Sequence, residues 1–352
     1  MSDSASLYDL GWAPFFENAW AELNRRDLTP GRVAVQHRGA FVVYTESGEL
    51  WAEISGRMRH EATSKADLPA AGDWVACRVR PEEKTATIEA ILPRRTKFSR
   101  HEAGFVTEEQ VLAANIDVVF LMTALDSDLN PRRLERYLAM TWGSGAEPVG
   151  VLTKADLCDD AAEAMALVAA QAPGVALHAI SALSGDGVDE LRPYLGAGRT
   201  VALLGSSGVG KSTLVNALVG QEVQAVKDIR SDGKGRHTTS RRELIAVPGG
   251  GLILDTPGMR ELQLWDDNGG MSQTFDDVDS LAEQCRFRDC RHEREPGCAV
   301  LAAVEDGTLP EERLVSFKKL QRELHRLQVK QDQRAQSEER RKRRVFARSL
   351  RN

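Results

Sequence analysis

The stretch Gly205-Ser206-Ser207-Gly208-Val209-Gly210-Lys211-Ser212-Thr213 decides how the central part of this chain folds. The apolar run 201–204 precedes it and the run 214–218 follows it, which predicts a strand, a glycine-rich turn and a helix start. The glycines let backbone N–H groups point inward, and the helix N-terminus adds a positive dipole end, so the turn favours phosphate. Lys211 supplies a cation for the outer phosphates and Ser212 a hydroxyl for Mg²⁺. The alternative is a chance glycine turn, which the flanking strand and helix argue against.

Length and composition set the outer limits. The chain has 352 residues, 42% of them hydrophobic, and a formal net charge of −6. This length predicts two or three domains. We find no apolar run long enough for a membrane span and no secretory pattern in residues 1–7, so the cytoplasm is the expected location. The last dozen residues, 341–352, hold six bases and no acid, which favours a polyanionic partner.

The N-terminal third predicts a small β-barrel after a mostly helical lead-in, residues 1–28, to which no function is assigned. Five short strands are expected, over 33–35, 40–44, 50–54, 74–79 and 86–91. Strands of this length and spacing predict an OB-fold barrel, assigned to residues 29–98. Two arginines and three aromatic residues offer cations and stacking planes to single-stranded RNA: Arg57, Arg59, Phe41, Tyr44 and Trp51. Alternatively, the aromatic residues are barrel core and the arginines form a solvated face.

Residues 105–263 predict an α/β domain, because strands and helices alternate along the chain and favour a largely parallel sheet. Strands are expected over 117–122, 148–152, 175–180 and 201–204, with a hairpin over 243–254. Helices are expected from Asn130, which is a suitable cap before Pro131, and over 161–170 and 188–195. Four strands end in polar motifs or in the phosphate loop, and parallel sheets bind ligands at the carboxyl ends of their strands.

The polar motifs have separable roles in binding a guanine nucleotide. Thr153-Lys154-Ala155-Asp156 offers two carboxylate oxygens to the N1 and N2 donors of guanine, and adenine lacks the second donor. The Lys154 stem would lie along the base, and Ser181-Ala182 would add backbone N–H groups. In Asp255-Thr256-Pro257-Gly258, Asp255 accepts from Mg²⁺-bound water and the Gly258 N–H reaches the terminal phosphate. The first motif is weak alone, but together with the others it predicts GTP with Mg²⁺.

The order of these motifs resembles one family in particular. In ordinary translational GTPase-like proteins the phosphate loop comes first, whereas here the base-binding motifs precede it. A circular permutation explains this order, because joining neighbouring termini and cutting elsewhere preserves every strand's neighbours. A predicted barrel precedes the permuted domain and a cysteine cluster follows it. In this arrangement residues 31–327 closely resemble the ribosome small-subunit-dependent GTPase A (RsgA) family. The resemblance implies a GTPase that binds the small ribosomal subunit and its rRNA in late assembly. Hydrolysis to GDP would be stimulated by the subunit and would drive release, and a monomer is expected.

The resemblance also implies functional residues at matching positions. The family's switch segment appears as Gly235-Arg236-His237-Thr238-Thr239, in which Thr239 is the expected second Mg²⁺ ligand beside Ser212. Met259 follows the D-x-x-G motif where many GTPases carry a water-orienting glutamine. His237 would take over that work, with Lys211 as the other catalytic residue. Alternatively, His237 is an exposed loop histidine without a catalytic part.

One departure from the family pattern concerns the base-binding motif. Thr153 stands where asparagine is commoner, so a side-chain amide that braces the site is missing. We expect at most a weakened affinity for nucleotide.

A cluster of soft ligands predicts a metal site: Cys285, Cys290, His292 and Cys298. Three thiolates and one imidazole form a closed, structural tetrahedral Zn²⁺ site, and the spacing matches the family's zinc motif. The alternative is a set of free buried cysteines, for which the isolated Cys77 and Cys158 are better candidates. Four arginines alternate with the ligands and predict a basic knob that binds RNA: Arg286, Arg288, Arg291 and Arg294.

The remaining segment predicts a helical domain over 264–328 and a basic tail over 329–352. Apolar residues recur at helical spacing: Leu314, Phe317, Leu320, Leu324 and Leu327. The tail is expected to be disordered alone and to order on RNA, or to be a solvated tail without a target. Two rival functions stay open at this point. One is a P-loop ATPase or kinase, and the other is a nucleotide-gated RNA-binding protein with little turnover.

Overall fold

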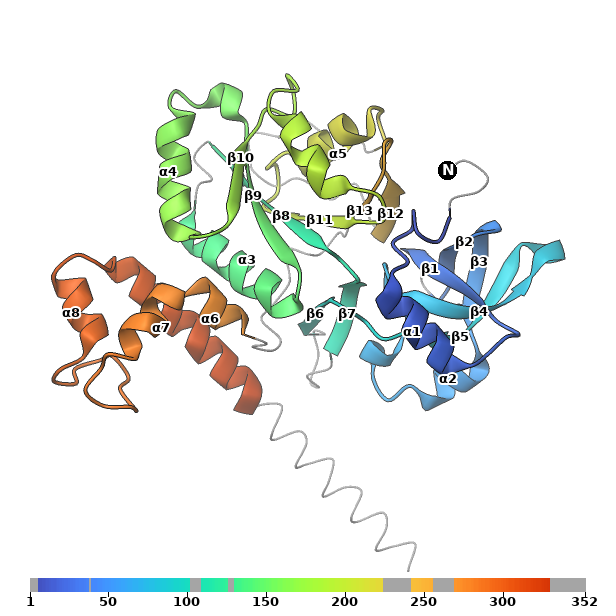
Figure 1. Ribbon diagram of the computed structural model, residues 1–352, viewed down its shortest axis with the longest axis horizontal. Coiled ribbons are helices and arrows are strands. Elements are labelled where there is room, and N and C mark those ends of the chain that lie inside the picture. Colours follow the sequence, from blue (N-terminus) through green and yellow to red (C-terminus); the bar gives the residue numbers. More distant parts are fainter. Residues whose placement is uncertain are drawn as a thin grey trace, which may run out of the picture.

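The computed structural model describes residues 6–37, 39–101, 109–125, 130–223, 242–255 and 269–329. An N-terminal barrel, a central sheet flanked by helices and a C-terminal group of helices follow one another along the chain (Figure 1). Within the described ranges, no helix combines the length and the apolar character needed to cross a membrane. The basic tail beyond residue 329 lies outside these ranges.

The N-terminal barrel contains the five predicted strands. They are β1 (Thr29–Gln36), β2 (Phe41–Thr45), β3 (Gly48–Ile54), β4 (Trp74–Arg80) and β5 (Thr85–Ile91). The strands pair in the order β1-β2-β3-β5-β4, and β4 pairs again with β1, which closes the barrel. The short helices α2 (Gly56–Glu61), η1 (Lys65–Asp67) and η2 (Pro81–Glu83) fill the connections. Apolar residues of alternate positions fill the interior, among them Val33, Val43 and Ile88. The predicted five-strand barrel is confirmed.

The barrel's aromatic residues divide between the two interpretations left open by the sequence. Phe41 is 5% exposed and belongs to the barrel core, whereas Trp51 is 47% exposed. The Trp51 ring lies 5.0 Å from the ring of His37, centroid to centroid. Arg57 is solvated and forms an ion pair with Glu61 on the same helix. The core interpretation therefore holds for Phe41, and Trp51 stays available for stacking.

The lead-in segment covers the outside of the barrel. Helix α1 (Pro14–Leu23) starts at a proline and brings Phe16 against the fully buried Trp74, with ring centroids 5.8 Å apart. Trp12 packs edge-on against the same indole at 4.7 Å. This aromatic cluster gives residues 6–23 a structural role that the sequence alone did not reveal.

The central sheet has the predicted strands with small shifts of their ends. They are β8 (Val118–Ala124), β9 (Glu147–Thr153), β10 (Ala176–Ala179), β11 (Thr200–Gly205), β12 (Arg242–Ala246) and β13 (Leu252–Asp255). The order is β10-β9-β8-β11-β13-β12, in which β12 alone runs antiparallel to its neighbour in this list. The carboxyl ends of the parallel strands therefore meet at one edge of the sheet.

Helices cover both faces of this sheet (Figure 1). Side chains of β8 alternate between the faces: Val119 and Leu121 join the cluster of α3 (Pro131–Ser144) and α4 (Ala161–Gln171), while Phe120 and Met122 face the other side. That second side is covered by α5 (Lys211–Val219) and by the segment Val188–Leu195. As predicted, the Asn130 side chain caps α3 by accepting from the Arg133 N–H.

One predicted helix has a different form. Residues Val188–Leu195 form the 3₁₀-helix η4 rather than an α-helix. Pro193 lies inside the segment, and in an α-helix its ring would clash with the carbonyl group four residues back, which disfavours the α form. A second short 3₁₀ turn, η3 (Ala155–Leu157), follows β9.

The connection between barrel and sheet contains a hairpin that the sequence analysis missed. Strands β6 (Lys97–His101) and β7 (Glu109–Ala114) pair antiparallel. Lys97 and Ser99 both contact the Glu109 carboxylate, at 2.8 and 2.6 Å. The buried residues of β7, 111–114, are consecutive, so the alternation by which a half-buried strand is normally predicted is absent.

Barrel and central sheet are joined into one continuous sheet, which was not predicted. The end of β1 pairs antiparallel with the start of β12, with Val35 opposite Glu243 and Gln36 opposite Arg242. Among the described residues the combined sheet has 11 strands. Because β13 lies next to β12, the barrel is two strands away from the strand that ends at Asp255.

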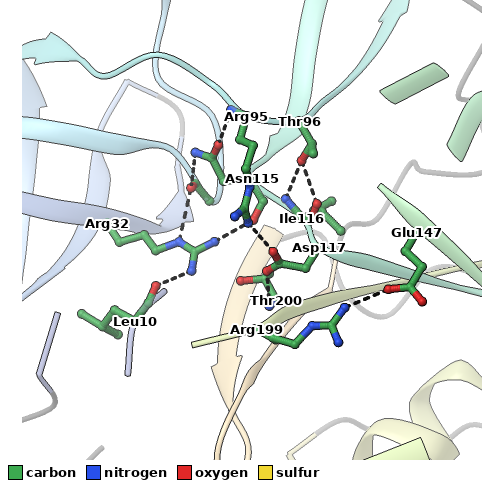
Figure 2. A network of polar contacts seen from close by, with 11 residues as sticks. Leu10, Arg32, Arg95, Thr96, Asn115, Ile116, Asp117, Glu147, Arg199 and Thr200 are labelled. Carbon is green, nitrogen blue, oxygen red and sulfur yellow. Dashed lines mark hydrogen bonds and ion pairs between the residues drawn. The ribbon is translucent and has the colours of Figure 1, made fainter. Parts of the chain in front are cut away.

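A partly buried polar network fixes the same joint at the opposite edge of the sheet (Figure 2). The Arg32 side chain is 1% exposed and donates to the carbonyl oxygens of Leu10 and Asn115. Asp117, which precedes β8, accepts from Arg95 and from the Thr200 N–H at the start of β11. Burial lowers the pKa of Arg32 to about 10, so the guanidinium stays charged at neutral pH. The network thus ties lead-in, barrel and sheet together.

The C-terminal helices pack on α3. They are α6 (Gly270–Thr274), α7 (Asp276–Ala282), α8 (Ala299–Glu305) and a helix over residues 311–329. Gly270 touches α3 so closely that an added Cβ would lie 2.2 Å from the Ala139 carbonyl oxygen. The predicted apolar stripe of the last helix is buried at Leu314, Phe317, Leu320 and Leu324.

A buried ion-pair network fastens the last helix. Arg313 and Glu135 of α3 are each 2% exposed and lie 3.0 Å apart, and Arg313 also bonds Asp277 of α7. Near the other end of the helix, Glu323 pairs with Arg136 of α3. The helical part is therefore held to the central domain by charge as well as by apolar contact.

Candidate nucleotide site and metal centre

The predicted nucleotide motifs meet at the carboxyl edge of the central sheet. Thr153 ends β9, Gly205 ends β11 and Asp255 ends β13, while Ser181 follows β10 by two residues. Because β8, β9, β10, β11 and β13 are parallel, these four positions share one edge. This is where open α/β sheets bind ligands.

The predicted phosphate loop runs from the end of β11 to the start of α5. Gly208 and Gly210 have φ angles of 75° and 99°, in the left-handed region that favours glycine. At Gly205 an added Cβ would lie 2.6 Å from the Met122 carbonyl oxygen on β8, so only glycine fits there. Val209 is buried in the core and anchors the loop. The remaining loop residues are half-buried or exposed: Ser206, Ser207, Lys211, Ser212 and Thr213.

Lys211 lies across the mouth of this loop. Its ammonium donates to the carbonyl oxygens of Gly205 and Ser206, at 2.9 and 2.5 Å. The cation is therefore held beside the inward-facing backbone and the N-terminus of α5, where an anion gains from both. A bound phosphate would exchange these carbonyl contacts for charged ones, which are stronger.

Thr153 joins the base-binding motif to the phosphate loop. Its side chain is 2% exposed, and its hydroxyl donates to the Val209 carbonyl oxygen at 2.7 Å. Thr153 lacks the amide expected from the family pattern, but its hydroxyl reaches the loop from a buried position. Its effect on nucleotide affinity stays a prediction.

The two base-binding motifs lie side by side. The Ala155 N–H donates to the Ile180 carbonyl oxygen at 3.1 Å, directly before Ser181-Ala182. Lys154 adopts a left-handed φ of 59°, which is uncommon for a residue with a side chain and is often found at functional sites. Asp156 is exposed on this edge, and Ser181 is 2% exposed.

Part of the predicted site lies outside the described residues. Asp255 is half-buried at the end of β13, opposite Glu243. Gly258 and Met259 fall in the undescribed range 256–268, and the switch segment with His237 and Thr239 falls in 224–241. The roles of these residues stay predictions.

The predicted metal ligands converge in the C-terminal domain. Four potential ligand atoms all lie within 4.8 Å of one another, one each from Cys285, Cys290, His292 and Cys298. The Cys285 and Cys298 sulfurs are 3.8 Å apart, and His292 Nδ1 lies 3.7 and 3.3 Å from them. Tetrahedral Zn²⁺ with Zn–S of about 2.3 Å separates two sulfurs by about 3.8 Å, so the spacing of the Cys285 and Cys298 sulfurs could accommodate zinc.

Surrounding groups orient these ligands. Cys298 caps α8, and its sulfur accepts from the Leu301 N–H at 3.4 Å. The Glu295 carboxylate accepts from three backbone N–H groups of the loop, and these bonds lower its pKa to about 2. Burial, and then the Lys318 ammonium, lower the pKa of His292, which favours the neutral imidazole that a metal requires.

The loop around the cluster carries exposed charges of both signs. The four arginines are exposed, but three carboxylates lie among them: Asp289, Glu293 and Glu295. Arg286 stacks on the exposed Phe287 ring, 5.5 Å from guanidinium carbon to ring centroid. The four arginines exceed these three carboxylates by one, and the loop also presents an aromatic plane.

Phosphate-loop and base-binding motifs at one edge of a parallel sheet, in permuted order, define a circularly permuted P-loop GTPase. The chain belongs to the RsgA GTPase family, whose characteristic domain matches residues 91–265. The description "50S ribosome-binding GTPase" belongs to a second domain family, which matches residues 200–334. The chain is thus a GTP hydrolase, and GTP with Mg²⁺ is its implied substrate.

Relatives support this assignment over nearly the whole chain. The small ribosomal subunit biogenesis GTPase RsgA of Opitutus terrae is 50% identical over 328 residues, which cover 90% of this chain and 89% of that protein. The Streptomyces coelicolor protein of the same name is 45% identical and covers 96% of this chain and 92% of its own length.

Solved structures share the fold. The crystal structure of YjeQ from Thermotoga maritima superimposes with a TM-score of 0.63 at 27% identity, covering 84% of this chain and 98% of that one. YloQ, described as a circularly permuted GTPase, superimposes with a TM-score of 0.61 over 86% of this chain and 96% of its own, at 22% identity.

Proposed function

We propose that this GTPase binds the small ribosomal subunit during late assembly and leaves it after hydrolysing GTP. The observation that carries the proposal is the convergence of the base-binding and phosphate-loop motifs at one sheet edge, in a chain whose relatives are named for biogenesis of that subunit.

In this proposal the nucleotide is held by the motifs of the carboxyl edge. Asp156 and Lys154 recognise guanine together with Ala155 and the backbone of Ser181-Ala182. The loop 205–213 holds the phosphates, and Ser212 and Thr239 ligate Mg²⁺. Asp255 and Gly258 sense the terminal phosphate, and His237 orients the attacking water.

The switch is coupled to RNA binding through the chain's neighbouring parts. The segment 235–239 ends shortly before β12, which pairs with barrel strand β1. The D-x-x-G segment runs on towards α6 of the C-terminal domain. GTP would therefore order the segment between two RNA-binding parts, and loss of the terminal phosphate would loosen their grip.

A single structural Zn²⁺ completes the C-terminal domain in this proposal. The ion would be held by Cys285, Cys290, His292 and Cys298. Four protein ligands fill a tetrahedral site, so no open position would be left for catalysis. Bound metal would fix the loop that carries Phe287. This loop, the barrel surface around Trp51 and the basic tail would contact rRNA. The protein would act as a monomer in the cytoplasm.

Turnover measured with and without purified small subunits tests the proposal. We expect strong stimulation by small subunits and none by large ones, and equal rates would contradict it. Sedimentation with either subunit in GDP and in a non-hydrolysable GTP analogue shows whether binding follows the nucleotide.

Two further measurements address the rival functions. Competition between GTP and ATP separates a GTPase from an ATPase or kinase, and Asp156 predicts that GTP wins. Single-turnover hydrolysis on small subunits separates a productive GTPase from an RNA clamp that nucleotide merely stabilises.

A further inference from the structure

We propose that His178 is a positioning residue for guanine recognition, because it clips the edge strand β10 to η4 and thereby orients the Ser181-Ala182 turn between them. The inference rests on the proposed function, in which this turn contacts the base.

Strand β10 needs an additional restraint. It is four residues long, and among the described strands it pairs with β9 alone. A short edge strand holds its end less firmly than a central one, since its backbone is bonded on one side. The turn that follows would inherit this mobility unless side chains fix it.

His178 provides this restraint with both ring nitrogens. Nδ1 lies 2.9 Å from a Glu190 carboxylate oxygen, and Nε2 lies 3.0 Å from the Tyr194 hydroxyl. Both partners are on η4, four residues apart. Because a carboxylate only accepts, Nδ1 donates to Glu190, and with this tautomer Nε2 accepts from the tyrosine.

Tyr194, one of the two partners of His178, packs against the core of the central domain. The Tyr194 ring packs edge-on against Phe120 of β8, with centroids 5.9 Å apart and planes at 88°. Phe120 is fully buried in the middle of the sheet. The sequence of contacts from Phe120 through Tyr194 to His178 therefore connects a central strand to the edge strand.

The turn between the two stems is small and internally closed. The Ser181 N–H donates to the Asp186 carbonyl oxygen at 2.9 Å, and the Gly185 N–H donates to the Ser181 carbonyl oxygen at 2.8 Å. At Gly187 an added Cβ would lie 2.6 Å from the Ala179 carbonyl oxygen, so the stems touch. A closed turn of this kind moves as a unit, and its orientation follows from the stems that His178 joins.

This geometry makes a selective prediction about the base. Within this turn the Ala182 N–H would face O6 of guanine, which adenine replaces with an amino group, because the Ser181 N–H is bonded to Asp186. Asp156 would bind the N1 and N2 donors independently, and hypoxanthine lacks the N2 amine. Loss of the His178 contacts should therefore weaken the preference for guanine over adenine, which differ at position 6 of the purine. The preference for guanine over hypoxanthine, which differ at position 2, should stay intact.

Calorimetry on the full chain with GDP, IDP and ADP tests this. For His178→Ala we expect the GDP-over-ADP preference to fall about tenfold, the size of one lost hydrogen bond. The GDP-over-IDP preference should stay unchanged. His178→Gln, which can both donate and accept, should restore most of the loss. Tyr194→Phe keeps the packing on Phe120 and should give a smaller fall.

Arg192→Ala is the matched control, because Arg192 pairs with Asp189 on the same η4 but faces solvent. It should leave all three affinities unchanged. If wild-type protein is guanine-selective and the His178→Ala and Tyr194→Phe variants keep both preferences, or weaken all three nucleotides equally, the clip does not position the turn. Wild-type protein that binds GDP and ADP alike would overturn the proposed function as well.

Discussion

Thr153 connects the two halves of the predicted nucleotide site with a single hydrogen bond. Its hydroxyl holds the Val209 carbonyl oxygen of the phosphate loop from a position that water does not reach. A buried carbonyl that loses its donor suffers the full cost of its lost hydration. The residue should therefore influence affinity without touching the nucleotide.

Substituting Thr153 tests this brace. Thr153→Val keeps the shape and removes the donor, so GDP affinity should fall about tenfold. Thr153→Ser keeps the hydroxyl and should bind GDP nearly as well as wild type. Calorimetry measures both, and equal affinities for the valine and serine variants would show that the bond is irrelevant to binding.

His237 is the residue that we expect to orient the attacking water, and it lies outside the described ranges. For His237→Ala we expect retained GTP affinity and subunit-stimulated turnover lowered roughly a hundredfold, the range of a lost water-positioning group. His325→Ala, at an exposed position on the last helix, is the control. Unchanged stimulated turnover would remove His237 from the mechanism.

Among the elements, the last helix depends on one buried arginine. Arg313 reaches Glu135 of α3 and Asp277 of α7, and it also stacks over Phe275. We expect Arg313→Met to destabilise the fold by about 3–5 kcal/mol, because Glu135 would be left as an uncompensated buried charge. Urea unfolding measures this.

A second arginine of the same helix supplies the comparison. Arg322 is exposed and donates to a backbone carbonyl of its own helix. Arg322→Met should change the unfolding free energy by less than about 0.5 kcal/mol. Similar values for the two variants would mean that the Arg313 network does not stabilise the fold.

The metal loop gives a prediction about removal of the ion. Chelation should increase hydrogen exchange in residues 285–305 by about a hundredfold, because the loop order would depend on the metal. The GDP affinity should stay within about twofold, since the cluster lies on the C-terminal helices and the nucleotide motifs lie at the sheet edge. Exchange that is insensitive to chelator would argue against a structural metal.

An element could be predicted from the sequence when the residues that determine it lie close together in the chain. The strands ending at Thr153, Gly205 and Asp255 were found because apolar runs end in recognisable polar motifs. The β6–β7 hairpin was missed because the apolar residues of β7, 111–114, are consecutive and do not alternate with polar ones. The metal ligands were predictable from spacing, whereas the partnership of Glu135 with Arg313 joins residues far apart in the sequence.

At the scale of the whole molecule, the barrel's pairing with β12 was not predictable. Val35 and Glu243 carry no complementary local signal, and edge-to-edge pairing depends on how two domains meet. The polar network around Arg32 and Asp117 explains why they meet in one orientation, since it fixes the joint at the other end (Figure 2).

This joint predicts a response of the barrel to nucleotide. With a non-hydrolysable GTP analogue instead of GDP, amide exchange at residues 33–36 should slow by about tenfold, because an ordered switch segment would steady β12. Residues 77–80 of β4 do not pair with β12 and should not respond. Uniform exchange in both nucleotide states would contradict the coupling.

Strand β1 also covers the first two residues of the outer edge of β12, Arg242 and Glu243. A polypeptide shortened to the nucleotide-binding half would present β12 with bare amide and carbonyl groups along one side, a template on which further copies could polymerise. The barrel covers the start of this edge, at Arg242 and Glu243, and would hinder such edge-to-edge association there. Shortened versions that drop the first hundred or so residues should for this reason precipitate, however intact their catalytic loops.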